Sequence, residues 1–179
     1  MHGLIHLELR KFVEASFGAL AWSDLVRGAK LDSEIYTPMG SYPDEHMLAL
    51  VTEAVKLTGI PAPDLLEKFG EFLVGAYLSL YGSLLKPDWK TLDVLENTEE
   101  TIHRVVRLRH PGAKPPRLKT KRTGPKEVVL TYDSPRRLCA VARGIATGVA
   151  QRFSEKLTID DSKCMHRGDP ACVITFRTP

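Results

Sequence analysis

The first half of the chain carries apolar residues at three- and four-residue intervals, which is the spacing of amphipathic helices. The pattern stops at Gly18 and at Gly59, and glycine is common just after the end of a helix. Asp44 precedes the third apolar stretch and suits the N-cap position. Helices are predicted over residues 4–17, 22–27, 45–57 and 65–84. The last has a wide apolar face on which Gly70 and Gly75 permit close approach of a large partner.

A further helix is predicted over residues 90–106, and it places a histidine, His103, among aliphatic side chains. Beyond a proline-rich stretch the pattern changes to alternating and β-branched residues, which is typical of strands. Strands are predicted over 126–132, 156–159 and 171–177, with a helix over 138–153 between the first two. Because helices come first and a sheet bearing one long helix follows, the pattern predicts an α+β fold rather than α/β.

Composition fits one folded domain spanning residues 1–179. Hydrophobic residues make up 43% of the 179 positions and charged residues 26%, which is ordinary for a globular protein. The longest apolar stretch is interrupted by glycine and glutamate well short of the ~20 residues that span a bilayer. The N-terminus lacks the basic and apolar regions of a secretory leader. We therefore expect a cytoplasmic protein without membrane insertion.

The net charge of +3 hides a basic run, because residues 104–126 contain nine Lys or Arg and no Asp or Glu. Such a run is explained by a solvated face, by compensation of a bound anion, or by docking of an acidic partner. The run contains no aromatic residue, so the stacking platform for single-stranded nucleic acid is missing. We expect no nucleic-acid partner.

Tyr132, Ser134 and Arg136 alternate where the first predicted strand meets the following helix. In extended backbone this spacing directs all three side chains to one side, and Pro135 keeps Ser134 extended. Ser134 suits the N-cap of the helix, with Pro135 at its first position. A phenol, a hydroxyl, a guanidinium and free helix N–H groups form a reasonable carboxylate receptor. The alternative is a capped helix with a surface arginine.

This Tyr-x-Ser-x-Arg pattern resembles the haem-propionate motif of the H-NOX (haem-nitric oxide/oxygen binding) family. His103, which precedes Tyr132 by the family's separation, resembles the proximal ligand, and the His110-Pro111 and Pro115-Pro116 pairs resemble the loop with the haem-contacting proline. The resemblance covers nearly the whole chain. It includes the opening Met1-His2-Gly3-Leu4-Ile5, the stretch around Trp22, Tyr42-Pro43-Asp44, and the Phe-Gly-x-Phe core within residues 66–72.

The resemblance implies the H-NOX fold with haem b between a distal helical subdomain, about residues 1–65, and a proximal α+β subdomain, about 66–179. It implies that His103 binds the iron, that Pro116 contacts the haem, and that Tyr132, Ser134 and Arg136 hold the propionates. Apolar lining is expected from Ile5, Val74, Leu78, Val141 and Ile145. Without the resemblance, a lone histidine on an apolar helix face is more often a core residue, and the five apolar residues are ordinary core.

The resemblance also implies a gas sensor rather than an enzyme. Family members that stabilise bound oxygen use a tyrosine where this chain has Val141, so we expect NO and CO binding with poor oxygen binding. Signalling is expected through release of His103 and movement of the subdomains, read by a separate histidine kinase or diguanylate cyclase. No nucleophile–base pair or paired carboxylate has a spacing that indicates catalysis.

Three cysteines, Cys139, Cys164 and Cys172, resemble the structural zinc site of many H-NOX domains. An odd number of thiols without a leader favours free thiols or metal ligands over disulfides, and three thiolates favour zinc. The family's histidine ligand falls where this chain has Asp161, so either Asp161 or His166 is the candidate fourth ligand. The alternative function is a haem-poor, zinc- or thiol-based redox sensor of the same fold that acts by binding a partner.

Overall fold

A computed structural model describes residues 1–32, 35–110 and 112–179, so Pro111 of the expected loop lies outside the described residues. The helices are α1 (Gly3–Phe17), α2 (Ala21–Gly28), α3 (Asp44–Thr58), α4 (Ala62–Tyr81), α5 (Thr91–Thr98), α6 (Arg104–Arg109) and α7 (Cys139–Arg152). The strands are β1 (Arg117–Gly124), β2 (Glu127–Asp133), β3 (Thr158–Lys163) and β4 (Cys172–Arg177). Within this part of the chain no helix is both long and apolar enough to cross a membrane.

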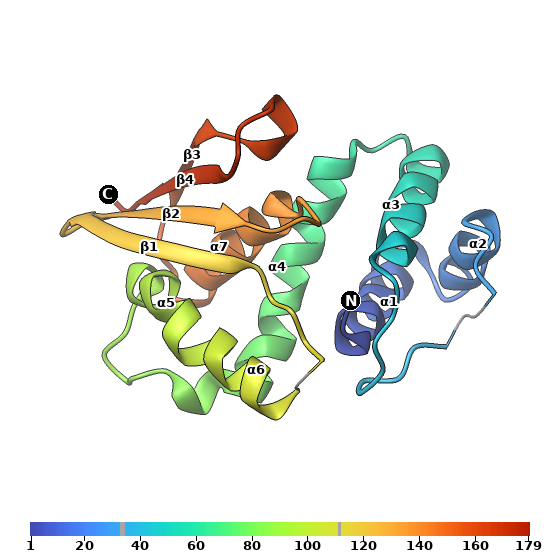
Figure 1. Ribbon diagram of the computed structural model, residues 1–179, viewed down its shortest axis with the longest axis horizontal. Helices are drawn as coiled ribbons and strands as arrows, with labels where there is room; N and C mark the ends of the chain where they lie inside the picture. Colours follow the sequence, from blue (N-terminus) through green and yellow to red (C-terminus); the bar gives the residue numbers. More distant parts are fainter. Residues whose placement is uncertain (33–34, 111) are drawn as a thin grey trace.

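Helices α1, α2 and α3 gather at one side of the molecule and the sheet lies at the other, with α4 between them (Figure 1). The helical side has its own core, in which Trp22, Met47 and Leu50 are each 1% exposed. Their burial at helical spacing supplies the apolar contact that holds such short helices in place, because isolated helices of this length are marginal in water. Of these three helices, α1 and α3 contribute residues to the wall of a cavity.

Helices α4 and α7 pack closely along one another. A Cβ atom on Gly70 would lie 2.4 Å from the carbonyl oxygen of Val141, and one on Gly144 would lie 1.9 Å from that of Glu67. Only glycine permits backbones to approach this closely, so the pair fixes the position of α7 against α4. The predicted close approach is confirmed at Gly70, whereas a Cβ on Gly75 would meet nothing within 4 Å.

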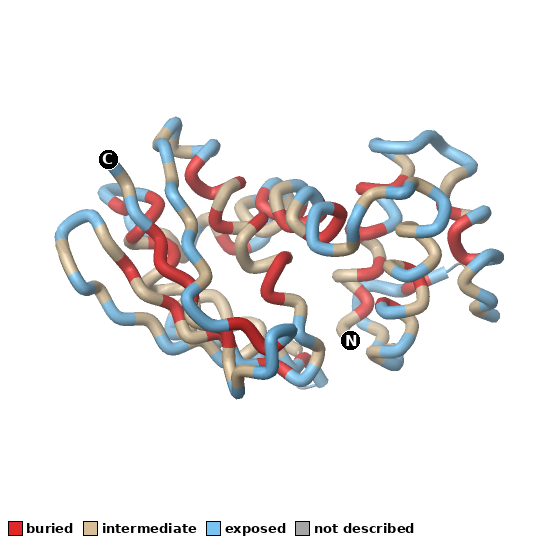
Figure 2. Tube along the Cα trace, turned by 90° about the horizontal axis from the view of Figure 1, so that it is seen from above, coloured by how far each residue is buried: buried red, intermediate tan, exposed pale blue. Residues whose placement is uncertain are grey.

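The four strands form one antiparallel sheet in the order β1-β2-β4-β3. Alternate residues of β2 are buried, as period-two packing requires, and Val128 pairs with Phe176 of β4 in the centre of this core. Figure 2 shows buried stretches in red within the sheet, and in β2 the buried positions alternate with half-buried ones. Helix α5 packs against β1 and β2, and α7 shares the core of the sheet through Cys139, Ala142 and Ala146. The predicted α+β class is confirmed.

Four local predictions were wrong. Strand β1 was not predicted, because its basic residues hide the alternation of exposed and half-buried positions. The helix expected over 90–106 is divided by a π-helical turn at Glu99–His103. The helix predicted over 138–153 agrees with α7, but Ser134 and Pro135 do not begin it, because a turn with Arg137 in the left-handed region at φ 52° comes before Cys139. Asp44 is the first residue of α3 rather than its N-cap, which is Pro43.

Candidate functional site

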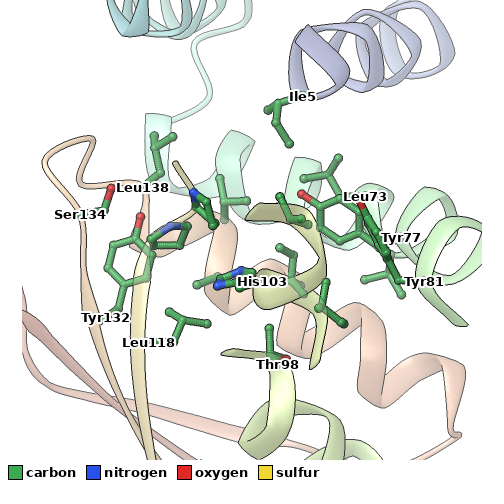
Figure 3. Close-up of a pocket in the computed structure, with 18 of the residues that line it drawn as sticks. Ile5, Leu73, Tyr77, Tyr81, Thr98, His103, Leu118, Tyr132, Ser134 and Leu138 are labelled. Carbon is green, nitrogen blue, oxygen red and sulfur yellow. The ribbon is translucent and has the colours of Figure 1, made fainter. Parts of the chain in front are cut away.

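A cavity of about 240 Å³ lies between the α1–α3 side of the molecule and the sheet. Helices α1, α4 and α7, the segment from α5 to α6, and strands β1 and β2 all contribute to its walls. Aliphatic and aromatic side chains dominate the lining, and a few polar groups are placed among them. Figure 3 shows His103 in the middle of this lining, with Tyr132 and Ser134 towards one end and Tyr77 and Tyr81 towards the other.

Every residue that the sequence analysis assigned to haem contact lies on the wall of this one cavity. These residues are Ile5, Val74, Leu78, His103, Pro116, Tyr132, Ser134, Arg136, Val141 and Ile145. They come from seven separate elements or loops, so the fold brings together positions up to 140 residues apart only when the two sides of the molecule close on each other. Their roles toward a bound group remain predictions.

His103 ends the π-helical turn, and its ring is held by a carboxylate one turn earlier. Its Nδ1 lies 2.8 Å from Oε2 of Glu99. A carboxylate only accepts, so the proton is on Nδ1 and the lone pair of the neutral ring is on Nε2. Burial lowers the pKa of His103, and the neighbouring Glu99 opposes that shift only in part. The imidazole is therefore neutral at pH 7, which is the form that binds a metal.

Glu99 has further donors besides His103. Its carboxylate receives a hydrogen bond from the guanidinium of Arg107 and one from the backbone N–H of Leu118 at 3.3 Å. Burial alone would raise the pKa of Glu99, but the His103 and Arg107 hydrogen bonds outweigh it and hold that pKa below its usual value. The sequence analysis missed Glu99, although its i, i+4 spacing to His103 on a predicted helix was a usable signal.

The polar end of the cavity consists of Tyr132, Ser134 and Arg136. Tyr132 and Ser134 are each 3% exposed, and burial raises the pKa of Tyr132 to about 12, so its hydroxyl keeps its proton. The Ser134 Oγ accepts from the backbone N–H of Arg136 at 3.3 Å. Because α7 begins only at Cys139, the free helix N–H groups expected beside Ser134 are not there.

The Arg136 guanidinium joins the two sides of the molecule. Its Nε donates to Oδ1 of Asp44 on α3 at 2.9 Å, and its Nη1 donates to the Lys114 carbonyl at 2.6 Å. Asp44 also forms an ion pair with the N-terminal amine at 2.9 Å. The predicted surface-arginine alternative is wrong, because the side chain of Arg136 is only 15% exposed and lines the cavity.

Two further phenols also line the cavity, although neither was predicted from the sequence as a site residue. Tyr77 and Tyr81 come from α4. Burial raises the pKa of both hydroxyls, most strongly at Tyr77, so both stay neutral. At the start of α7, Val141 offers no hydroxyl group to the cavity. Tyr77 and Tyr81 nevertheless supply hydroxyl groups from α4.

The donor set fits haem. An imidazole with its lone pair on Nε2 lies in an apolar wall, which suits the iron and the macrocycle, and Tyr132, Ser134 and Arg136 offer donors for two carboxylates at one end. Haem iron is commonly held by a histidine whose second nitrogen is hydrogen-bonded, as His103 is by Glu99.

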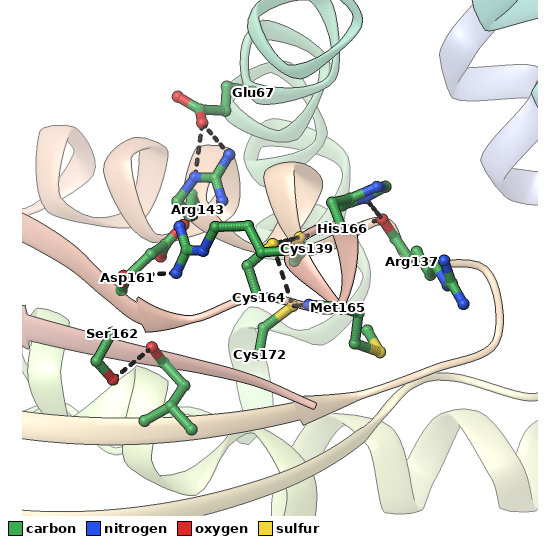
Figure 4. Close-up of polar contacts among 12 residues, drawn as sticks. Glu67, Arg137, Cys139, Arg143, Asp161, Ser162, Cys164, Met165, His166 and Cys172 are labelled. Carbon is green, nitrogen blue, oxygen red and sulfur yellow. Dashed lines mark hydrogen bonds and ion pairs between the residues drawn. The ribbon is translucent and has the colours of Figure 1, made fainter. Parts of the chain in front are cut away.

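The three cysteines form a second cluster beside the sheet (Figure 4). The Sγ atom of Cys164 lies 3.9 Å from that of Cys139 and 3.8 Å from that of Cys172, and all three side chains are buried. Burial, with the neighbouring thiols, raises the pKa of Cys139 to about 12. Within the described ranges these residues are the one group of three whose ligand atoms all lie within 4.8 Å.

Neither candidate fourth ligand joins the three sulfur atoms in this arrangement. His166 Nε2 lies 2.7 Å from the Arg137 carbonyl oxygen, and Oδ2 of Asp161 accepts from Arg143 at 2.7 Å. The other oxygen of Asp161, Oδ1, is buried and has no hydrogen-bond partner among the described residues. The sequence thus identified the three cysteines correctly as a cluster. A fourth ligand would have to come from His166 or Asp161, which have other partners in this structure.

The fold and the cavity together define a ligand-binding α+β domain. The sequence profile of the Haem-NO-binding family (HNOB) matches residues 2–161. The chain therefore belongs to this family of H-NOX domains, which are haem-based gas sensors rather than enzymes.

Solved H-NOX structures superimpose on the whole chain. An H-NOX protein from S. oneidensis in the Fe(II)NO state has a TM-score of 0.93 at 25% identity, covering 100% of this chain and 99% of that one. The H-NOX domain from Shewanella oneidensis in the Fe(II)CO state has a TM-score of 0.89 at 25% identity over 100% and 99%. The Fe(II) unliganded H-NOX protein from K. algicida shares the fold with a TM-score of 0.91 at 24% identity over 100% and 97%.

A curated relative outside this group is the DNA polymerase of Bacillus phage SP02, which is 35% identical over 89 residues. That match takes in 49% of this chain, and the chain spans 13% of the length of the polymerase. A likeness to so small a part of the polymerase carries no activity to this chain.

Proposed function

We propose that this protein is a haem b-based sensor of NO and CO in which His103 holds the iron. The observation that carries the proposal is the placement of His103: its Nδ1 is committed to Glu99, and the ring lies on the wall of the cavity that Tyr132, Ser134 and Arg136 close at one end. A ferrous haem bound there supplies an open coordination position for a diatomic gas.

The polar end positions the two carboxylates. Arg136 carries the one positive charge among the three predicted propionate-binding side chains, and the neutral hydroxyls of Tyr132 and Ser134 donate beside it. Pro116 and the apolar residues of the lining exclude water from the macrocycle. These residues are Ile5, Val74, Leu78, Val141 and Ile145.

The preference for NO and CO rests on Val141, which offers no hydrogen bond at the start of α7. Bound oxygen carries partial negative charge and gains from a hydrogen-bond donor, whereas NO and CO need one far less. A hydrogen bond from the Tyr77 or Tyr81 hydroxyl to bound oxygen would remove this preference. A stable oxygen complex of the wild type would therefore contradict it.

Signalling is proposed to follow from the release of His103. Once NO weakens its attachment, His103 and the Glu99–Arg109 segment are free to relax, and the distal part, about residues 1–65, shifts against residues 66–179. The Asp44–Arg136 ion pair joins the two parts and has to adjust in that movement. The reader of the movement is proposed to be a separate histidine kinase or diguanylate cyclase.

A second metal is proposed at the cysteines. Three buried thiols suit the tetrahedral preference of zinc, with the Sγ atom of Cys164 3.9 Å from that of Cys139 and 3.8 Å from that of Cys172. The unpartnered Oδ1 of Asp161 makes Asp161 the better fourth ligand of the two, because His166 would first have to leave the Arg137 carbonyl. If haem binding fails, this cluster supports the alternative function, a zinc- or thiol-based redox sensor that acts through a partner.

The test of the main proposal is His103→Ala in the ferrous protein. We expect the variant to lose the absorption of histidine-bound haem and to regain it when imidazole is added. His6→Phe is the matched control, since His6 is also buried in a helix and does not line the cavity. Unchanged spectra in His103→Ala would refute the assignment of the iron ligand.

A further inference from the structure

We infer that Glu99 is a positioning residue for His103, fixing its ring and setting the strength of the bond that His103 makes to iron. The inference rests on the proposed function, since it assumes that His103 is the iron ligand. Glu99 would then influence how readily His103 is released. The proposed function gives Glu99 no role of its own.

The backbone places the two side chains together. Glu99 begins the π-helical turn and His103 ends it, and such turns are rare and occur frequently at functional sites. The turn leaves Nδ1 of His103 at 2.8 Å from Oε2 of Glu99. Since this hydrogen bond uses Nδ1, Nε2 is the ring nitrogen that can bind a metal.

The carboxylate is itself held in place. Arg107 of α6 donates to Oε1, and the backbone N–H of Leu118 on β1 donates to Oε2 at 3.3 Å. The Glu99 side chain is 20% exposed. A carboxylate fixed by three donors presents its charge to His103 in one direction, so rotation of the imidazole costs a charge-assisted hydrogen bond.

The chemical consequence follows from the second nitrogen. An anionic acceptor on Nδ1–H makes the imidazole more basic, and a more basic Nε2 is the stronger ligand. Removing the negative charge of Glu99 should therefore weaken the iron–His103 bond and make its release under NO easier. Glu99 also accepts hydrogen bonds from Arg107 of α6 and from Leu118 of β1. Release of His103 therefore affects the contacts of both α6 and β1.

The neighbouring residue provides a matched control. Glu100 lies in the same turn, carries the same charge, and is exposed. Within the described part of the chain its carboxylate has no hydrogen bond or ion pair. Glu100→Gln therefore removes one negative charge from the same turn without touching His103.

The experiment compares ferrous wild type, Glu99→Gln and Glu100→Gln by resonance Raman spectroscopy. We expect the iron–histidine stretching band to move to lower frequency in Glu99→Gln and to stay at the wild-type position in Glu100→Gln. In the NO complexes, we expect Glu99→Gln to shift the equilibrium between bound and released His103 by roughly tenfold toward release, the lower end of the usual second-shell effect.

The outcomes separate the inference from the function on which it rests. If the wild type shows no iron–histidine band, or His103→Ala keeps it, the proposed function is overturned. If the band is present and depends on His103 but is the same in both glutamine variants, the inference about Glu99 is overturned.

A measurement on the wild type covers the case in which Glu99→Gln does not fold. In the CO complex with ¹⁵N-labelled histidine, the inference predicts a slowly exchanging, strongly downfield Nδ1 proton on His103. A proton that exchanges with solvent at the rate of an exposed histidine would overturn it.

Discussion

The cavity at His103 and the cluster at Cys164 are both candidate metal centres, yet they are built differently. At His103 a single ligand is supported by a carboxylate at 2.8 Å, and polar groups for a large cofactor lie across the same cavity. At Cys164 three ligands are packed against one another, while the side chains that would complete the site are bound to Arg137 and Arg143. The His103 centre thus has one ligand and the residue that orients it. The Cys164 centre has three ligands, but its candidate fourth ligand has other partners.

The comparison teaches that ligand type alone does not define a centre. The imidazole at His103 is already neutral and oriented, so little has to change for it to bind iron. The thiols are also buried, but burial raises the pKa of Cys139 to about 12, and a bound zinc must displace that proton. We therefore expect the two centres to be loaded independently.

The largest expected effect tests that independence through Cys172→Ser. We expect wild-type protein to carry about one zinc per chain and the variant to carry none, because two thiolates leave the tetrahedron incomplete. Haem uptake should persist in the variant. Metal analysis and absorption spectroscopy on the same samples measure both quantities.

Asp161→Ala and His166→Ala then identify the fourth ligand, with loss of zinc expected only in Asp161→Ala. Wild-type protein that folds and holds no zinc would reduce the cluster to three thiols.

His6 sharpens the comparison, because it is a buried imidazole with no partner at either ring nitrogen among the described residues. It is stacked on Tyr36 with ring centroids 4.3 Å apart. Burial, helped by the N-terminal amine and His46 and opposed by the His2 backbone and Asp44, lowers the pKa of His6 to about 4. The unfolded chain therefore binds more protons between pH 6.5 and pH 4, so stability falls as the pH falls through this window.

His6→Phe should remove most of that acid loss, which is about 3 kcal/mol for a shift of this size. Urea unfolding of wild type and variant at pH 7 and pH 4.5 measures it. The free energy of unfolding should fall less in the variant over this interval. Equal losses in the two proteins would show that His6 is not the titrating group.

The elements that could be predicted from sequence are those whose pattern is local. The helices over 4–17 and 45–57 agree with α1 and α3, since their apolar residues and terminal glycines act within the segment. Strand β1 could not be found this way, because it is held by pairing with β2 and its exposed side is basic. The turn between β2 and α7 depends on a left-handed residue, Arg137, that no propensity predicts.

The same limit applies to the candidate sites. Family resemblance selected His103, Tyr132, Ser134 and Arg136 correctly as residues of one cavity. It included Asp44 in the Tyr42-Pro43-Asp44 match, but it gave no sign that Asp44 reaches Arg136 from a helix 92 positions earlier. Contacts of this kind depend on how the two sides of the molecule close, which the linear pattern does not contain.

A smaller effect is expected from Arg136→Met, which tests the polar end of the cavity. Loss of a charge-assisted hydrogen bond should speed the transfer of haem to an acceptor protein roughly tenfold. Arg137→Met is the control, because Arg137 is the adjacent arginine and its side chain is exposed. Equal haem loss from both variants would show that Arg136 acts only through net charge.

An effect of similar size is expected on gas choice. Val141→Tyr adds a hydroxyl at the start of α7, and one hydrogen bond to bound oxygen should slow oxygen release about tenfold. Val141→Phe fills the same space without the hydroxyl and should not slow it. Stopped-flow release rates distinguish them, and equal rates in the two variants would show that position 141 does not contact the bound gas.

The most direct test of the account is the absorption spectrum of the wild-type protein, reduced and then exposed to NO. The account predicts a Soret band from histidine-bound ferrous haem that moves on addition of NO as His103 is released. A protein that takes up no haemin, or whose band does not respond to NO, would contradict it.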